Sequence, residues 1–103
     1  MFEDSQWREK EPLQLIHIDL CGPIRTQSLG NAKYFMLLID ICNRKTWVYF
    51  LKEKSEVFKI FIEFKAMVEN ESGYRIQRLR SYNRGEFTSN EFKEFCKKNG
   101  IRR

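Results

Sequence analysis

The 103-residue chain has little proline, glycine and histidine, and these shortages exclude several classes of protein. Two Pro and five Gly are too few for a collagen-like or low-complexity chain. No apolar run reaches the roughly 18 residues that a membrane-spanning helix needs, and the polar N-terminal segment does not resemble a signal peptide. With 42% hydrophobic and 15% aromatic residues, the chain is too apolar for a disordered tail. We therefore expect one globular domain, or a piece of one, with no membrane partner.

Three cysteines and a single histidine give little support to a structural zinc site. Cys21, Cys42 and Cys96 are widely spaced, and none belongs to a CxxC pair. A structural zinc ion takes four Cys or His ligands, usually in close pairs. We therefore interpret the cysteines as buried or half-buried thiols of a protein in a reducing compartment.

Hydrophobic spacing predicts three strands after a polar linker over residues 1–11. The runs are rich in aliphatic, aromatic and β-branched residues and cover 13–20, 33–41 and 46–51. The polar segment 42–45 has turn chemistry, so the second and third runs are expected to form an antiparallel hairpin.

The spacing then changes to that of a helix. An apolar stripe recurs at intervals of four and three residues and consists of Val57, Phe61, Phe64 and Val68. It predicts an amphipathic helix with an N-cap at Ser55 and an end at Gly73. We expect the stripe to lie in the core and not to stack on bases.

The last third of the chain predicts a strand over 75–81 and a short helix. Thr88 and Glu91 fit a capping box, and Gly100 is a suitable end for that helix. The resulting order, β-β-β-α-β-α, indicates an α/β domain over 12–103 with a sheet covered by helices. The helical crossover from the third run to the fourth permits a parallel pairing.

Three segments resemble, in order, the integrase catalytic core of copia-type LTR retrotransposons. They are HIDLCGPI at 17–24, YFMLLIDICNRKTWVYFLKEKSEVF at 34–58 and LRSYNRGEFTSNEFKEFCKKNGI at 79–101. The resemblance implies an RNase H-like fold with a mixed sheet, which agrees with the element order. It also implies that the domain is incomplete at its C-terminus, with the fourth strand at an open edge.

The resemblance implies a Mg²⁺- or Mn²⁺-dependent DNA strand transferase with three metal-holding carboxylates. Asp19 matches the first of them and is the candidate metal ligand and vestigial catalytic residue. Tyr82 stands at the position of the second, an Asp, and the third is expected beyond the end of this chain. A phenol is neutral at pH 7, and Arg84 adds a positive charge beside it. We therefore expect no strand transfer by this chain alone.

Other polar residues have more ordinary interpretations. His17 shares a strand face with Asp19 and is expected to be a hydrogen-bonded core residue and not a ligand. Asp40 is expected to pair with Arg44 or Lys45 or to make a turn contact. Glu86 is interpreted as a loop carboxylate.

Positive charge is concentrated at the end of the chain. Residues 75–103 contain nine Lys or Arg against three acidic residues, a larger excess than the +5 of the whole chain. Such a region attracts phosphates irrespective of base sequence. The candidates for contact with nucleic acid are Arg80, Arg84, Lys97 and Lys98.

These observations favour a fragment of a retrotransposon integrase core, associated with DNA integration and nucleic-acid binding. The alternative is a non-catalytic nucleic-acid-binding or protein-interaction module that reuses the RNase H-like fold. The resemblance further implies DNA as partner, self-association as in integrases, and a nuclear location.

Overall fold

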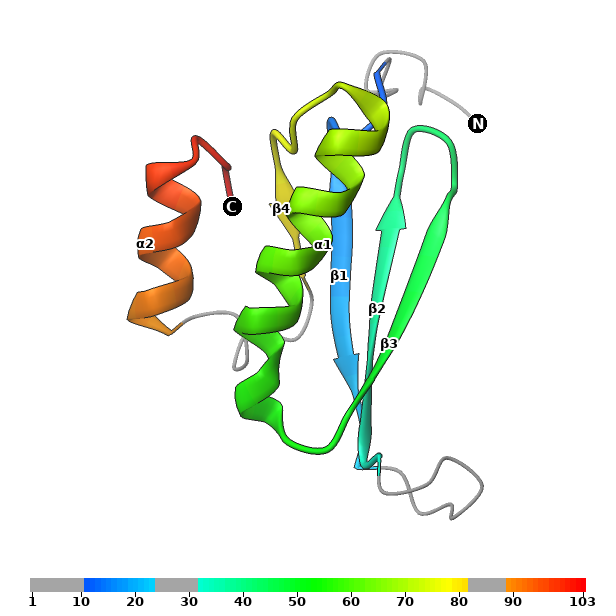
Figure 1. Ribbon diagram of the computed structural model, residues 1–103, viewed down its shortest axis with the longest axis vertical. Coiled ribbons are helices and arrows are strands. Elements are labelled where there is room, and N and C mark those ends of the chain that lie inside the picture. Colours follow the sequence, from blue (N-terminus) through cyan, green and yellow to red (C-terminus); the bar gives the residue numbers. More distant parts are fainter. Residues whose placement is uncertain (1–10, 24–31, 82–88) are drawn as a thin grey trace.

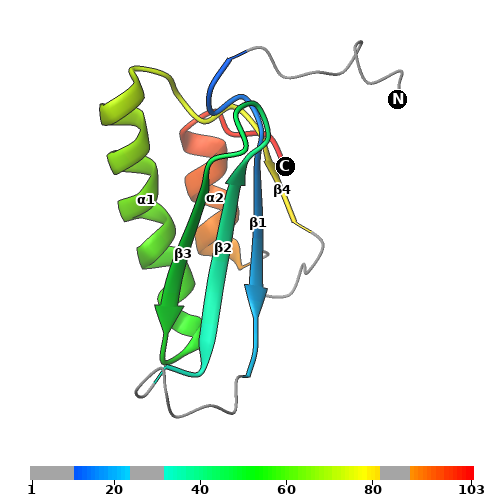
Figure 2. The same cartoon turned by 90° about the vertical axis from the view of Figure 1, so that its right-hand side faces the viewer.

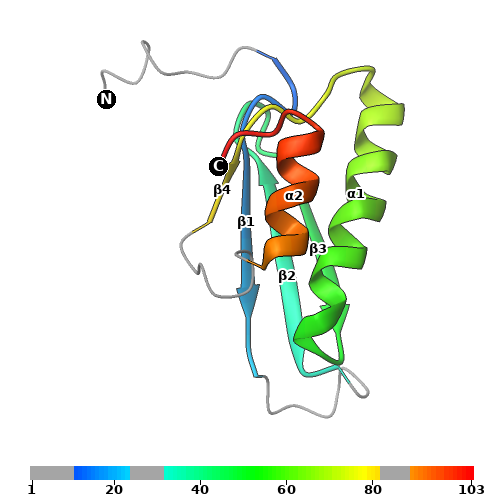
Figure 3. The same cartoon turned by 90° about the vertical axis from the view of Figure 1, so that its left-hand side faces the viewer.

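The computed structural model describes residues 11–23, 32–81 and 89–103. A single mixed sheet carries both helices on one of its faces (Figures 1, 2 and 3). In chain order the elements are β1 (Ile16–Cys21), β2 (Tyr34–Asp40), β3 (Thr46–Leu51), α1 (Val57–Ser72), β4 (Leu79–Arg80) and α2 (Asn90–Lys98). The predicted order β-β-β-α-β-α is confirmed.

The strands lie in the order β3-β2-β1-β4 across the sheet. β2 pairs antiparallel with both β1 and β3, which confirms the predicted hairpin. The helical crossover carries the chain from β3, at one edge, to β4, which pairs parallel with β1. The strand that contains Asp19 is therefore enclosed by a neighbour on each side.

β1 shows the period-two alternation of a strand with one covered face. Ile16, Ile18 and Leu20 are buried beneath the helices, whereas the residues between them are only half-buried. The strand begins later than residue 13 because the preceding segment forms a turn, in which Leu13 has a φ of 66°.

Aromatic rings fill the space between the helices and the sheet. The four residues of the predicted stripe on α1 are 0–3% exposed, so its interpretation as core is confirmed. Phe61 lies 5.0 Å from the Phe92 ring of α2, and Trp47 of β3 meets Phe64 at the same distance between ring centroids. Each such side chain contributes about 1.5–3 kcal/mol when fully buried.

The helix starts differ from those predicted. Ser55 lies within a 3₁₀ turn, Lys54–Glu56, and does not cap α1. The Glu56 carboxylate instead accepts the backbone N–H groups of Lys52 and Glu53, each at 2.9 Å. The end of α1 at Gly73 is confirmed by a left-handed residue there, with φ of 79°.

The second helix is capped by Ser89, whose Oγ accepts the N–H of Phe92 at 3.2 Å. Thr88, the predicted cap, lies outside the described residues. The helix ends at Lys98, two residues before Gly100.

β4 is shorter than the predicted strand 75–81, and its outer edge is partly covered. Arg102 forms a parallel bridge with Arg78. The carbonyl of Arg102 accepts the N–H of Leu79 at 2.8 Å, and the N–H of Arg102 donates to the carbonyl of Gln77 at 2.9 Å. The expectation of an open edge at the fourth strand is therefore wrong where these last residues pair with it.

Gly22 brings the chain after β1 close to the start of β2. Its φ is +134°, and a Cβ there would lie 2.7 Å from the Lys33 carbonyl oxygen and 2.8 Å from Cδ1 of Tyr34. Gly73 also has positive φ, +79°, but a Cβ at that position would meet nothing within 4 Å.

Gly22→Ala is therefore expected to be more destabilising than Gly73→Ala. Left-handed backbone alone costs about 1–2 kcal/mol, which is the loss expected for Gly73→Ala. Gly22→Ala adds the steric conflict with Lys33, so its loss in free energy of unfolding should exceed that of the control by at least ~1 kcal/mol. Urea denaturation followed by circular dichroism measures both, and equal losses would contradict the close approach.

Candidate metal and nucleic-acid site

Asp19 lies on the sheet face that the helices leave uncovered. His17 precedes it by two residues on the same face, and its Nε2 lies 2.8 Å from Oδ2 of Asp19. The side chains are 12% and 24% exposed, respectively. The prediction that His17 is hydrogen-bonded is confirmed, and its partner is the candidate metal ligand itself. The prediction that it is a core residue is wrong, because it lies half-buried on the open face while the alternate residues of β1 fill the core.

The two carboxylate oxygens of Asp19 have different surroundings. Oδ2 is held by His17, whereas Oδ1 is buried and has no hydrogen-bond partner among the described residues. An unpartnered buried carboxylate oxygen is costly, and hard cations such as Mg²⁺ bind oxygen ligands of this kind. The Asp19 carboxylate is therefore suited to supply one of the oxygen ligands of a metal ion.

The described segments do not complete a metal site around Asp19. Within 11–23, 32–81 and 89–103, no group of three or more His, Cys, Asp or Glu residues could hold a metal ion. Tyr82, at the position of the second carboxylate, and Glu86 both lie outside the described residues. The described part of the chain thus fits one ligand of a metal centre and not a full set.

Asp40 shows how a structural carboxylate in this fold differs from Asp19. It is 1% exposed, and its two oxygens accept the backbone N–H groups of Leu13 and Cys42, each at 3.0 Å. The contact with Cys42 is the predicted turn contact. The contact with Leu13 joins the turn before β1 to the end of β2.

Arginines line the sheet edge next to the Asp19 face. Arg80 of β4 lies opposite His17 of β1 in the parallel register, so the side chains of the two residues project from the same face. Arg78, two residues earlier, and Arg102, its bridge partner, are exposed like Arg80. The sequence prediction named Arg80 as a candidate but not the other two. The alternation of Arg with Leu79 was a signal for Arg78, whereas Arg102 reaches this edge only through its bridge to Arg78.

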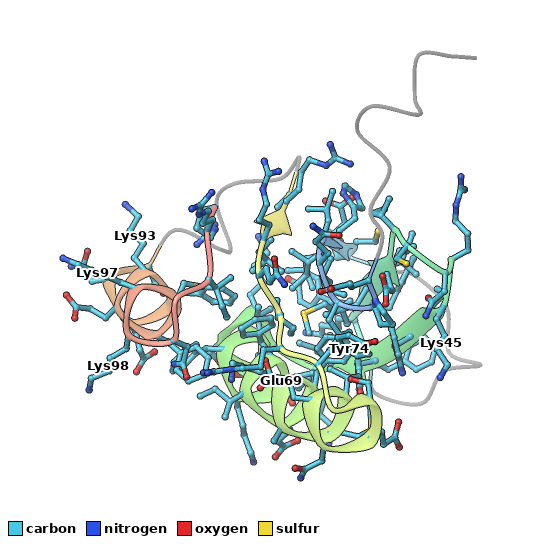
Figure 4. The ribbon with its side chains drawn as sticks, turned by 90° about the horizontal axis from the view of Figure 1, so that it is seen from above. Lys45, Glu69, Tyr74, Lys93, Lys97 and Lys98 are labelled. Atoms are coloured by element: carbon cyan, nitrogen blue, oxygen red, sulfur yellow. The ribbon has the colours of Figure 1, made fainter. Side chains whose placement is uncertain are left out.

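The predicted lysines lie elsewhere. Lys97 and Lys98 are exposed on α2 and point away from the sheet, as does Lys93 (Figure 4). The structure therefore does not bring Lys97 and Lys98 together with Arg80. Arg84, the remaining candidate, lies outside the described residues.

The three cysteines are free thiols, as interpreted from the sequence. Cys21 and Cys42 are half-buried and Cys96 is buried. Burial raises the pKa of the Cys96 thiol, and the nearby guanidinium of Arg103 partly opposes this shift. A buried thiol of this kind is unreactive and serves packing.

Among the described helices, none has the length and apolar character needed to cross a membrane.

Comparison with known families decides the broad identity of the chain. The family described as Integrase core domain matches residues 9–103. The chain belongs to this family. The integrase core family is in general metal-dependent, which agrees with a carboxylate such as Asp19 on the open sheet face.

The curated relatives are transposon polyproteins. The chain is 48% identical over 101 residues to the retrovirus-related Pol polyprotein from transposon TNT 1-94 of Nicotiana tabacum, covering 98% of this chain and 8% of that protein. It is 38% identical to the corresponding polyprotein from transposon RE2 of Arabidopsis thaliana, over 97% of this chain and 7% of the relative. The truncated transposon Ty1-A Gag-Pol polyprotein of Saccharomyces cerevisiae is 27% identical over 88% of this chain and 8% of its own length. The resemblance to copia-type retrotransposon integrase cores is therefore confirmed, and the chain spans less than a tenth of these relatives.

A solved structure confirms the fold. The chain aligns with a TM-score of 0.69 and 17% identity to a chain in the cryo-EM structure of the simian T-cell lymphotropic virus intasome in complex with PP2A regulatory subunit B56 gamma. The alignment covers 92% of this chain and 32% of that one. The predicted RNase H-like α/β class is thereby confirmed.

Removal of the two carboxylates should have different effects on stability. Asp40→Ala leaves the amides of Leu13 and Cys42 without an acceptor in the interior and should lower the free energy of unfolding by about 2–4 kcal/mol. Asp19→Ala removes one hydrogen bond together with a buried unpartnered oxygen, so the expected change is less than about 1 kcal/mol. Urea denaturation of both variants measures the two losses in free energy of unfolding. An equally large loss for Asp19→Ala would show that Asp19 is a structural residue.

Proposed function

We propose that this chain is a DNA-binding segment of a retrotransposon integrase core that does not transfer DNA strands by itself. The observation that carries the proposal is that Asp19, with its unpartnered Oδ1, belongs to no group of three or more potential metal ligands among the described residues. The sequence adds a second argument, because Tyr82 occupies the position where the family pattern has its second acidic ligand.

The chemistry of the site supports this division between binding and catalysis. When bound, a pair of divalent cations stabilises the attacking and leaving oxygens of a transferred phosphate. In this chain, Asp19 would offer Oδ1 to a Mg²⁺ or Mn²⁺ ion, while His17 holds the other oxygen and so orients the carboxylate. The phenol of Tyr82 is neutral near pH 7 and does not replace a carboxylate in that role.

The arginine edge supports the binding part of the proposal. Arg78, Arg80 and Arg102 are exposed beside the His17–Asp19 face. Guanidinium groups bind phosphate oxygens through paired hydrogen bonds, and their charge acts on any DNA sequence. We propose that this edge contacts the phosphate backbone of DNA.

The catalytic part is tested with purified chain, labelled duplex ends and a target plasmid in the presence of Mg²⁺ or Mn²⁺. We expect no joining above the metal-free background, and the same background for Asp19→Ala. A catalytically competent integrase assayed on the same DNA serves as the positive control. Metal-dependent joining that disappears in Asp19→Ala would overturn the proposal.

The binding part is tested by fluorescence anisotropy of a labelled duplex over a series of salt concentrations. The logarithm of the affinity should fall linearly with the logarithm of the salt concentration. Replacing Arg78 and Arg80 together by Ala should reduce the slope by about 2, one for each lost phosphate contact.

The matched control replaces Lys97 and Lys98 by Ala, which removes the same charge from the far side of α2. We expect this control to change the slope less than the arginine pair does. A larger effect of the lysine pair would move the contact to α2, and an affinity independent of salt would contradict backbone binding altogether.

A further inference from the structure

β3 forms an edge of the sheet, with β2 as its neighbour and no described segment along its other side (Figure 1). The opposite edge, at β4, is partly covered by the bridge between Arg78 and Arg102. The two edges therefore differ in how many backbone groups they leave available for pairing.

The register identifies the unpaired backbone groups of β3. The N–H of Asp40 donates to the carbonyl of Lys45 at 2.8 Å, and the carbonyl of Leu51 accepts from Lys33 at 2.9 Å. In an antiparallel ladder the groups of alternate residues point toward the neighbouring strand. The backbone N–H and C=O groups of the odd-numbered residues of β3 therefore point toward β2. Those that point outward belong to Thr46, Val48 and Phe50.

The side chains of the same residues are also available for contact. Val48 is 47% and Phe50 52% exposed, and the Phe50 ring lies 6.4 Å from that of Phe35 on the neighbouring strand. No charged residue occurs between Lys45 and Lys52. Natural edge strands are usually protected from pairing by charges, prolines or bulges, and β3 has none of these within its length.

We propose that two copies of this chain pair antiparallel through their β3 strands, with Val48 of one copy opposite Val48 of the other. This register is self-complementary, because it also places Thr46 opposite Phe50 in both directions. Every outward N–H and C=O of the three residues then has a partner in the second copy. Paired residues keep to the same face, so Val48 packs against its counterpart and Phe50 against Thr46.

A second copy fits this edge better than an unlimited stack of copies. Pairing about a twofold axis uses the same strand of each partner and leaves no further β3 edge, so the assembly closes at two. Lys45 and Lys52 flank the strand and disfavour its extension beyond these bounds. The contact is independent of the proposed DNA binding, because β3 and the arginine edge lie at opposite sides of the sheet.

The oligomeric state is measured by sedimentation equilibrium of the full 103-residue chain, whose mass is 12.5 kDa, from low to high micromolar concentration. We expect a reversible approach to twice this mass. Val48→Lys should weaken association at least tenfold, because it places like charges opposite one another at the centre of the pair.

The matched control is Tyr74→Lys, which adds the same charge at another exposed apolar residue, 41% exposed and outside β3. It should leave the association unchanged. Val48→Pro is a second blocking variant, since it removes an outward N–H and leaves the ladder with β2 intact. Circular dichroism shows whether each variant is folded. A monomer at all concentrations, or a dimer insensitive to both Val48 variants, overturns the proposal.

Disulfide cross-linking tests the register. In a Cys21→Ser/Cys42→Ser background, Val48→Cys should give a covalent dimer on mild oxidation, because the paired Cα atoms lie about 5.5 Å apart. Phe50→Cys should not, because its counterpart is four residues away along the opposite strand. Efficient cross-linking through Phe50→Cys alone would overturn the proposed register. DNA binding by a monomeric Val48→Lys variant would show that the two surfaces act separately.

Discussion

The alternation of side chains along β1 is the constraint on which the rest of this structure depends. Ile16 and Ile18 are fully buried against the helices, and β1 is held in register by β2 on one side and β4 on the other. A shift of one residue would move these isoleucines to the open face and place His17 and Asp19 in the apolar core. Burial of the isoleucines therefore determines where the candidate metal ligand projects.

The two buried or half-buried aspartates show how position in the sheet separates a structural carboxylate from a candidate metal ligand. Asp40 ends a strand where backbone amides converge, and both its oxygens are used by them. Asp19 lies within a strand whose amides belong to the ladder, so the described partner of its carboxylate is the side chain of His17. The same residue type is thus stabilising in one place and incompletely paired in the other, and incomplete pairing is common at functional sites.

Local patterns made most of the elements predictable, and contacts between distant residues account for what was missed. The bounds of β3 and the buried stripe of α1 follow from spacing alone, and both agree with the structure. The predicted N-cap at Ser55 is wrong because the Glu56 carboxylate accepts hydrogen bonds from the chain before the helix. Residue preferences for the cap position do not indicate which of the two side chains makes these contacts. The hydrogen bond of Leu13 to Asp40 spans 27 residues, and no local pattern indicates it. For the candidate site, Asp19 and Arg80 were predicted from the sequence, whereas Arg102 comes to the same region only through its bridge to Arg78.

The order of strands also separates two kinds of surface. From β4 to β3 the open face changes from exposed arginines, through His17 and Asp19, to the apolar side chains of Val48 and Phe50. The phosphate binding proposed for the first edge would weaken as salt screens charge, whereas the backbone pairing and apolar burial proposed for the other edge would depend little on salt. Because β1 and β2 lie between the edges, a ligand at one need not exclude a partner at the other. The carboxylate of Asp19 then lies between the edge proposed to bind DNA and the edge proposed to pair with a second copy of the chain.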